Sequence, residues 1–188
     1  MAQRPQEKSK LTFVAEVLSL ALSPVNMIIL MIIGISIRFE IPMLYFLGIL
    51  SPFIIFTLIY ICYKFFIARD SDLDMTKLRM RRHIGYFSTV GFGISFLLAH
   101  NFFPFLDGMF LRAWIIIFIT GLVTLKWKIS FHAVGYASFC FTFIELFGQA
   151  WLVTLVLLPV IFWSRLQLKR HTFAQLVAGT LLSLVIII

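Results

Sequence analysis

Seven apolar segments follow one another along this chain of 188 residues, separated by short polar connections. They cover roughly residues 24–37, 42–66, 84–103, 109–125, 132–148, 150–163 and 172–188. A helix needs about 20 apolar residues to cross a bilayer, with a range of about 17–25. Because the bilayer core holds no water, a crossing segment has to satisfy its backbone hydrogen bonds internally. The sequence therefore predicts an all-α, polytopic transmembrane helical bundle with six to seven spans.

Composition supports a membrane environment for most of the surface. Hydrophobic residues make up 61% of the chain and charged residues 13%, and the mean hydropathy is +1.02. Soluble domains are about half apolar and about one quarter charged. The two cysteines lie inside apolar segments, and neither a disulfide framework nor a metal site is indicated. We expect an integral protein of the cell membrane that crosses it several times.

The domain organisation is predicted to be simple. Residues 1–23 combine a polar tail with an apolar stretch at 11–22, which carries Glu16 and ends at Ser23-Pro24. We interpret this stretch as an interfacial helix or as the lead-in to the first span. Residues 24–188 are predicted to form a single transmembrane domain.

The basic residues are unevenly distributed between the connections. The net charge is +8, from sixteen Lys and Arg residues against eight Asp and Glu. All but Arg38 and Arg112 lie in the N-terminal tail, the 64–83 loop, the 126–132 connection or the 164–171 connection. Two apolar segments separate each of these connections from the next, so all three are predicted to share one membrane face. The bias favours the cytoplasmic side and a lipid or anion partner, with no nucleic acid.

Polar residues near the opposite face have structural interpretations. Glu145 lies inside an apolar segment, where a charge costs about 2.5–3.5 kcal/mol at the bilayer centre. We expect Glu145 to lie near the far interface or to pair within the bundle. His100 is expected at that interface.

The connection before the last apolar segment combines an arginine and a histidine with a hydrogen-bond acceptor. His171 precedes that segment, where a helix N-terminus offers N–H groups and a positive dipole end to an anion. Gln175 lies one turn later on the same helix face, so its carbonyl is expected to accept from one ring nitrogen of His171. The other nitrogen then remains as a nucleophile. Arg165 offers a two-pronged donor to phosphate oxygens.

The connection near residue 130 has a similar pattern. Ser130 is a candidate N-cap of the following helix. His132 lies just inside that helix, and as an imidazolium it can donate a proton to a leaving oxygen.

These residues resemble the signatures of the type 2 phosphatidic acid phosphatase superfamily. Its last signature has Ser-Arg, five residues, His, three residues and Asp. Ser164, Arg165 and His171 match it, and Gln175 stands at the Asp position. A Gln at this place is similar to the dolichyl-diphosphate phosphatase branch of the superfamily.

The other two signatures match in part. The middle one, Pro-Ser-Gly-His, is matched at Ser130 and His132, with Phe131 at the Gly position. The first has Lys, six residues and Arg-Pro. Arg82 takes the Arg position, and Met75 stands where Lys is usual. Arg79, one turn before Arg82, or Lys77 is the candidate for the missing cation.

The resemblance implies a fold and a mechanism. The fold would be an acid-phosphatase-like helical core, and the reaction a metal-independent phosphatase reaction without a cofactor. His171 would attack phosphorus and form a phosphohistidine, and His132 would protonate the leaving group. Arg165, Arg82 and Arg79 or Lys77, with Ser130, would hold the phosphate. The substrate would be a lipid phosphate or a polyprenyl diphosphate.

Two alternatives remain open at this point. One is a catalytically degenerate protein on the same scaffold, which binds lipid phosphate without turnover. The other is a small transporter. For the 77–82 cluster alone, a positive-inside loop is the favoured explanation of the charges. A homo-oligomer is also open.

Overall fold

The chain folds into a bundle of helices. The computed structural model describes residues 10–67 and 78–188, and the side chains of residues 10–66 and 83–188. All regular structure in these ranges is helical. The α-helices are α1 (Lys10–Ala21), α2 (Pro24–Phe39), α3 (Met43–Cys62), α4 (Leu78–Phe102), α5 (Asp107–Thr124), α6 (Phe131–Phe147), α7 (Leu158–Gln167) and α8 (Phe173–Ile187). A π-helical turn (Tyr63–Ile67) continues α3, and 3₁₀ segments precede α5 (Pro104–Leu106) and α7 (Gln149–Leu157).

Four of these helical stretches are long and apolar enough to cross a membrane. They are Lys10–Phe39, Met43–Phe66, Pro104–Thr124 and Gln149–Gln167, while Phe131–Phe147 and Phe173–Ile187 are shorter apolar helices. Large apolar side chains point outward, as at Leu44 (80% exposed) and Val185 (78% exposed). Such a surface suits lipid as the solvent. The predicted all-α membrane bundle is confirmed at this level, and six to seven crossings remain a prediction.

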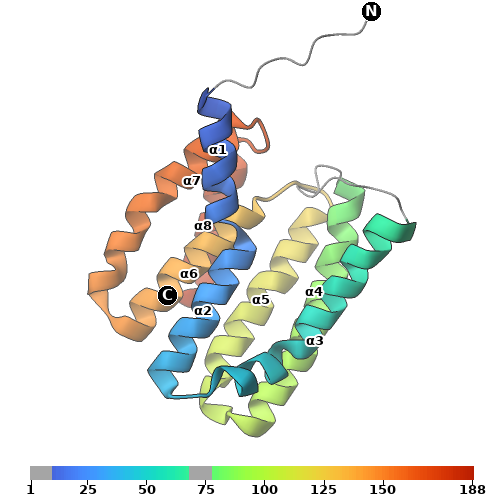
Figure 1. The fold of residues 1–188 in the computed structure, drawn as a ribbon, viewed down its shortest axis with the longest axis vertical. Coiled ribbons are helices and arrows are strands. Elements are labelled where there is room, and N and C mark those ends of the chain that lie inside the picture. Colours follow the sequence, from blue (N-terminus) through green and yellow to red (C-terminus); the bar gives the residue numbers. More distant parts are fainter. Residues whose placement is uncertain (1–9, 68–77) are drawn as a thin grey trace, which may run out of the picture.

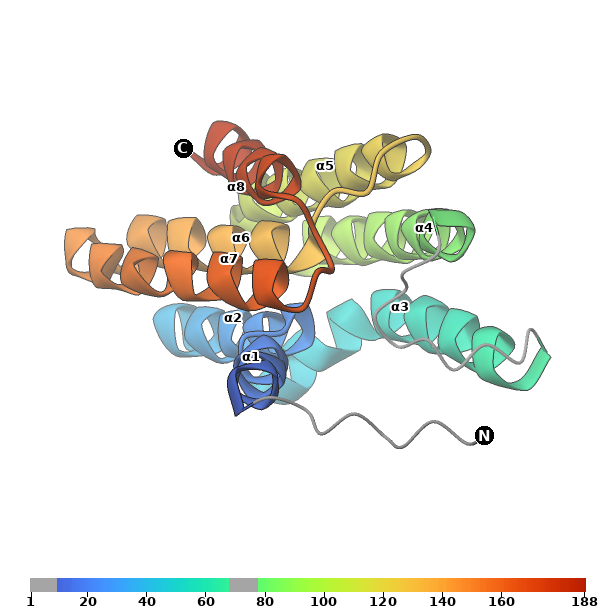
Figure 2. The same cartoon turned by 90° about the horizontal axis from the view of Figure 1, so that it is seen from above.

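The helices pack in two groups. One group is α3, α4 and α5, in which α4 contacts both neighbours. The other is built around α6, which packs against α2, α7 and α8, while α1 packs against α7. Figures 1 and 2 show α6 enclosed by its neighbours. Because α1 contacts α7, the helix that precedes residue 24 is packed into the bundle.

The basic connections share one end of the bundle. Figure 1 shows that α3, α5 and α7 finish at the end where α4, α6 and α8 begin. We call this the basic end, and it carries the 126–130 and 168–172 connections as well as Lys64. The predicted common face is thus present in the arrangement of the helices. The side of the membrane on which it lies is a prediction.

The opposite end has its own charged contacts. Arg112 Nη2 donates to Glu145 Oε1 at 2.5 Å, and its Nη1 donates to the carbonyl of Ile187 at 2.9 Å. Arg38 Nε donates to the carbonyl of Leu146 at 3.2 Å. The predicted pairing of Glu145 within the bundle is therefore confirmed. His100 lies at the same end, and its Nδ1 is 2.7 Å from Asp107 Oδ2.

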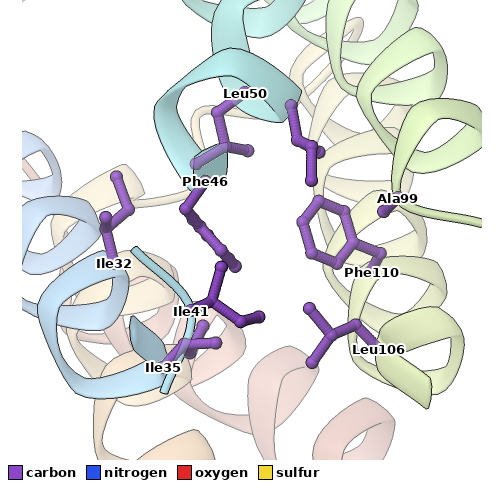
Figure 3. Packing of buried hydrophobic residues seen from close by; sticks show 9 residues of the cluster. Ile32, Ile35, Ile41, Phe46, Leu50, Ala99, Leu106 and Phe110 are labelled. Carbon is purple, nitrogen blue, oxygen red and sulfur yellow. The ribbon is translucent and has the colours of Figure 1, made fainter. Parts of the chain in front are cut away.

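Apolar side chains fill the space between the helices in three clusters. One of them joins α2, α3 and α5 near the opposite end, and Figure 3 shows Ile32, Phe46 and Phe110 in it. The other two surround α6. Glycines allow helices to approach closely within the α3–α4–α5 group. A Cβ atom on Gly85 of α4 would lie 3.1 Å from the Cα of Gly121 of α5.

Gly91 provides a test of this packing. A Cβ atom there would lie 3.0 Å from the Cα of Phe53 and from the carbonyl oxygen of Pro52, which are backbone atoms of α3. We expect Gly91→Ala to destabilise the protein by about 1–3 kcal/mol, because α3 and α4 have to separate. Thermal unfolding in detergent measures the change. Gly48→Ala is the control, since a Cβ atom on Gly48 of α3 meets nothing within 4 Å. Equal unfolding temperatures for the two variants would contradict this prediction.

Candidate active site

The N-terminus of α6 is capped as the sequence predicts. Ser130 has an extended backbone, and its Oγ accepts a hydrogen bond from the backbone N–H of Ala133 at 3.3 Å. The cap is fully buried, with Ser130 0% exposed. With Ser130 as the cap, the helix begins at Phe131, and His132 lies in its first turn. The positive end of the α6 dipole therefore lies beside His132.

The N-terminus of α8 is closed by a capping box. The Oγ1 of Thr172 accepts from the N–H of Gln175 at 3.4 Å, and Gln175 Oε1 accepts from the N–H of Thr172 at 3.1 Å. The same Oε1 lies 3.2 Å from Nδ1 of His171. Because an amide oxygen only accepts hydrogen bonds, Nδ1 of His171 carries the proton in this contact. In the neutral imidazole the lone pair is then on Nε2.

The two capped helix ends lie against each other. The N–H of Ser130 donates to the carbonyl of Gln175 at 3.4 Å. One turn farther along α8, Gly179 faces α6, and a Cβ atom there would lie 3.1 Å from the carbonyl oxygen of Ser130. The first turns of α6 and α8 are thus neighbours at the basic end. Two positive dipole ends meet there, which favours an anion.

Arg165 reaches this region from the last turn of α7. Its side chain is 1% exposed, and Nη1 donates to Oγ of Ser19 at 2.5 Å. The following turn is fixed by the N–H of Arg170, which donates to the carbonyl of Arg165 at 3.0 Å. A guanidinium removed from water requires hydrogen bonds or an anion to offset its lost hydration.

Ser19 of α1 connects two of the predicted residues. Its Oγ accepts from Arg165 and lies 3.4 Å from Nε2 of His132. Ser19 is 8% exposed, and both Ser19 and Glu16 line the cavity described below. The sequence analysis did not single out Ser19. Its only sequence signal is a small polar residue within an apolar helix, because its partners are 113 and 146 residues away.

The remaining predicted residues lie partly outside the described structure. Lys77 and Met75 belong to the part of the chain that is not described. Arg79 and Arg82 lie in the first turns of α4, at the basic end, but their side chains are outside the described ranges. The described residues therefore form two contacting sets. One set is His132, Arg165 and Ser19, and the other is His171 and Gln175. Ser130 connects the start of α6, which carries His132, with the start of α8, which carries Gln175.

A cavity of about 870 Å³ extends from the first of these sets into the bundle, and its lining does not include His171 or Gln175. Ser19, His132 and Arg165 line it at the basic end, and Phe131 lines it beside them. Phe131 thus contributes apolar surface to the cavity wall at the place where the superfamily signature has Gly. Volumes of about 300–1,000 Å³ are typical of sites for small molecules. Most of the wall is apolar, supplied by α2 to α6.

The described residues include no group of three or more His, Cys, Asp or Glu side chains arranged to hold a metal ion. Comparisons of the chain with protein families, with curated proteins and with solved structures find no match. The chemistry of the site has to be inferred from the residues themselves.

The capping box offers a test of how α8 positions His171. Thr172→Val removes the Oγ1 acceptor, and we expect a loss of about 1 kcal/mol in stability. Thr172→Ser keeps the acceptor and is the matched control. Thermal unfolding in detergent distinguishes the two. Identical stabilities of both variants and the unchanged protein would show that the cap contributes nothing.

Proposed function

We propose that this protein is an integral membrane phosphatase that hydrolyses a lipid phosphate or polyprenyl diphosphate through a phosphohistidine. The observation that carries the proposal is the meeting of His132 and Arg165 at the hydroxyl of Ser19. These two residues are 33 positions apart and belong to two different signatures of the superfamily that the sequence resembles. Their contact at one end of an apolar cavity supports a site for a phosphate with an attached hydrocarbon chain.

The tautomer of His171 supports its role as the nucleophile. Gln175 holds the proton on Nδ1, so the lone pair of Nε2 can attack phosphorus. In the first step the N–P bond forms and the bond from phosphorus to the leaving oxygen breaks. His132, protonated, gives that oxygen its proton. In the second step His132 takes a proton from water, the water oxygen attacks phosphorus, and inorganic phosphate leaves His171.

Positive charge supports the binding of phosphate. The positive dipole ends of α6 and α8 lie at the basic end, and Arg165, in the last turn of α7, brings its guanidinium to Ser19. Arg82, with Arg79 or Lys77, is proposed to complete the set of cations. Phosphoryl transfer depends mainly on positioning and on such electrostatic stabilisation. The fold that the proposal implies is an acid-phosphatase-like core, with the site on the cytoplasmic face.

His171 is the first residue to test. We expect His171→Ala to reduce phosphate release from a polyprenyl diphosphate in detergent to the background of the assay, because no nucleophile remains. His100→Ala is the matched control, because His100 pairs with Asp107 at the opposite end. Full activity of His171→Ala would overturn the mechanism.

The role of His132 predicts a dependence on the leaving group. We expect His132→Ala to lower kcat on an alkyl phosphate by about 10²–10⁴-fold, the usual contribution of a general acid. An aryl phosphate with an acidic leaving group needs less protonation, so its loss should be much smaller. Steady-state kinetics on both substrates measure the difference. Equal losses on the two would contradict general-acid catalysis by His132.

Binding of lipid phosphate without turnover is the second candidate. The neutral Gln175 favours it, because an amide stabilises a charged imidazole less than a carboxylate does, and its Oε1 also serves the capping box. Release of free phosphate, inhibited by vanadate as a transition-state mimic, supports hydrolysis over binding. A transporter would instead move substrate across sealed vesicles without releasing phosphate.

A further inference from the structure

The cavity that begins at Arg165 has a charged group at its other end as well. Arg112 of α5 and Glu145 of α6 line it there, and they form the ion pair described above. Their side chains are 32% and 39% exposed, so the pair also faces the medium at the opposite end of the bundle. Arg112 is held in place by its second hydrogen bond, to the carbonyl of Ile187.

The distance between the two charged ends follows from α6. His132 and Glu145 both line the cavity and are thirteen residues apart on one helix. At a rise of about 1.5 Å per residue, thirteen residues correspond to about 20 Å. An extended hydrocarbon chain advances about 1.25 Å per carbon, given C–C bonds of about 1.5 Å, so about 16 carbons fit. An isoprene unit adds about four carbons to the length of a polyprenyl chain, so this length corresponds to about four isoprene units.

The wall between the ends is apolar and comes from both groups of helices. Ile32 of α2, Phe46 of α3 and Phe110 of α5 line it toward the opposite end. Figure 3 shows Ile32, Phe46 and Phe110 in one packed cluster, in which the ring centroids of Phe46 and Phe110 are 5.8 Å apart. The cavity is partly open at the surface of the bundle, so a hydrocarbon chain in it would contact the apolar wall along one side, whereas a polar or charged ligand would lose hydration there.

We propose that the cavity binds the hydrocarbon chain of the phosphate substrate, and that the Arg112–Glu145 pair is the stop that sets the preferred chain length. The inference rests on the proposed function for its anchor, the phosphate held at Arg165. A chain shorter than the cavity leaves part of the wall without contacts. A longer chain pushes methylene groups against an ion pair, and displacing a paired charge from its hydrogen bonds is costly. Chains of about 16 carbons therefore bind best.

Competition between chain lengths tests the stop directly. The purified protein is mixed in micelles with equal amounts of alkyl phosphonates shorter than, equal to and longer than about 16 carbons. Phosphonates are not hydrolysed, so retention after gel filtration, measured by mass spectrometry, reports binding alone. We expect the intermediate length to be enriched about tenfold over the shortest and longest. Alkanols of the same lengths should be retained less, since they lack the phosphate anchor.

Two variants shift the preference in opposite directions. Thr142 lies on the cavity wall one turn before Glu145, and Thr142→Leu is expected to move the optimum to chains about four carbons shorter. The double variant Arg112→Ala/Glu145→Ala removes both charges together and should increase retention of the longest phosphonates. Arg38→Ala is the control, because Arg38 lies at the same end but does not line the cavity. Its chain-length preference should equal that of the unchanged protein.

The outcomes separate this inference from the proposed function. Retention that is independent of chain length, or a preference unchanged in both variants, overturns the chain stop even if His171 is required for phosphate release. Equal retention of alkanols and phosphonates also overturns it, because the phosphate would then not anchor the chain. A chain-length preference that shifts as expected, together with full activity of His171→Ala, upholds the chain stop and refutes the phosphohistidine mechanism.

Discussion

The close contact between α6 and α8 positions the candidate site. Gly179 lies where α8 passes the first turn of α6, and a side chain there would press on Ser130, Ala133 and Val134. Because Gly179 has no side chain, the N–H of Ser130 reaches the carbonyl of Gln175. Two helix N-termini are therefore held side by side, with His132 on one and His171 beside the other. Without this approach the two positive dipole ends would not be adjacent.

The membrane environment explains why polar groups gather at the two ends of the bundle. Between the ends, backbone groups are satisfied within the helices, and the side chains that separate the helices are mostly apolar. Among the described residues, the cations Lys64 and Arg165 are almost completely buried. Of these two, Arg165 is the one in the candidate site. Its position requires polar neighbours, which α1 supplies through Ser19. The N-terminal helix, which the resemblance does not cover, thereby contacts two residues of the candidate site, His132 and Arg165.

Features that depend on nearby residues could be predicted from the sequence. The apolar segments gave the helices, their parity gave the basic end, and four-residue spacing gave the contact between His171 and Gln175. The cap at Ser130 follows from local chemistry in the same way. The contacts of Ser19 and the shape of the cavity could not be predicted, because they depend on how helices distant in sequence pack. Because a charge in lipid is costly, the sequence predicts that Glu145 lies near the far interface or pairs within the bundle, but it does not identify Arg112 as the partner.

The arginines at the opposite end have a consequence for the axial register of the bundle. Arg38 of α2 binds the last turn of α6, and Arg112 of α5 binds the last turn of α8. The C-termini of α6 and α8 are thus each hydrogen-bonded to a different neighbouring helix, while their N-termini lie at the candidate site. If α6 or α8 moved along its axis, the arginine hydrogen bond at its C-terminus would have to break before its first turn changed position at the basic end. The axial positions of the first turns of α6 and α8 therefore depend partly on Arg38 and Arg112, which contact neither turn. They also depend on the hydrocarbon thickness of the membrane, which keeps the two guanidinium groups at the opposite surface.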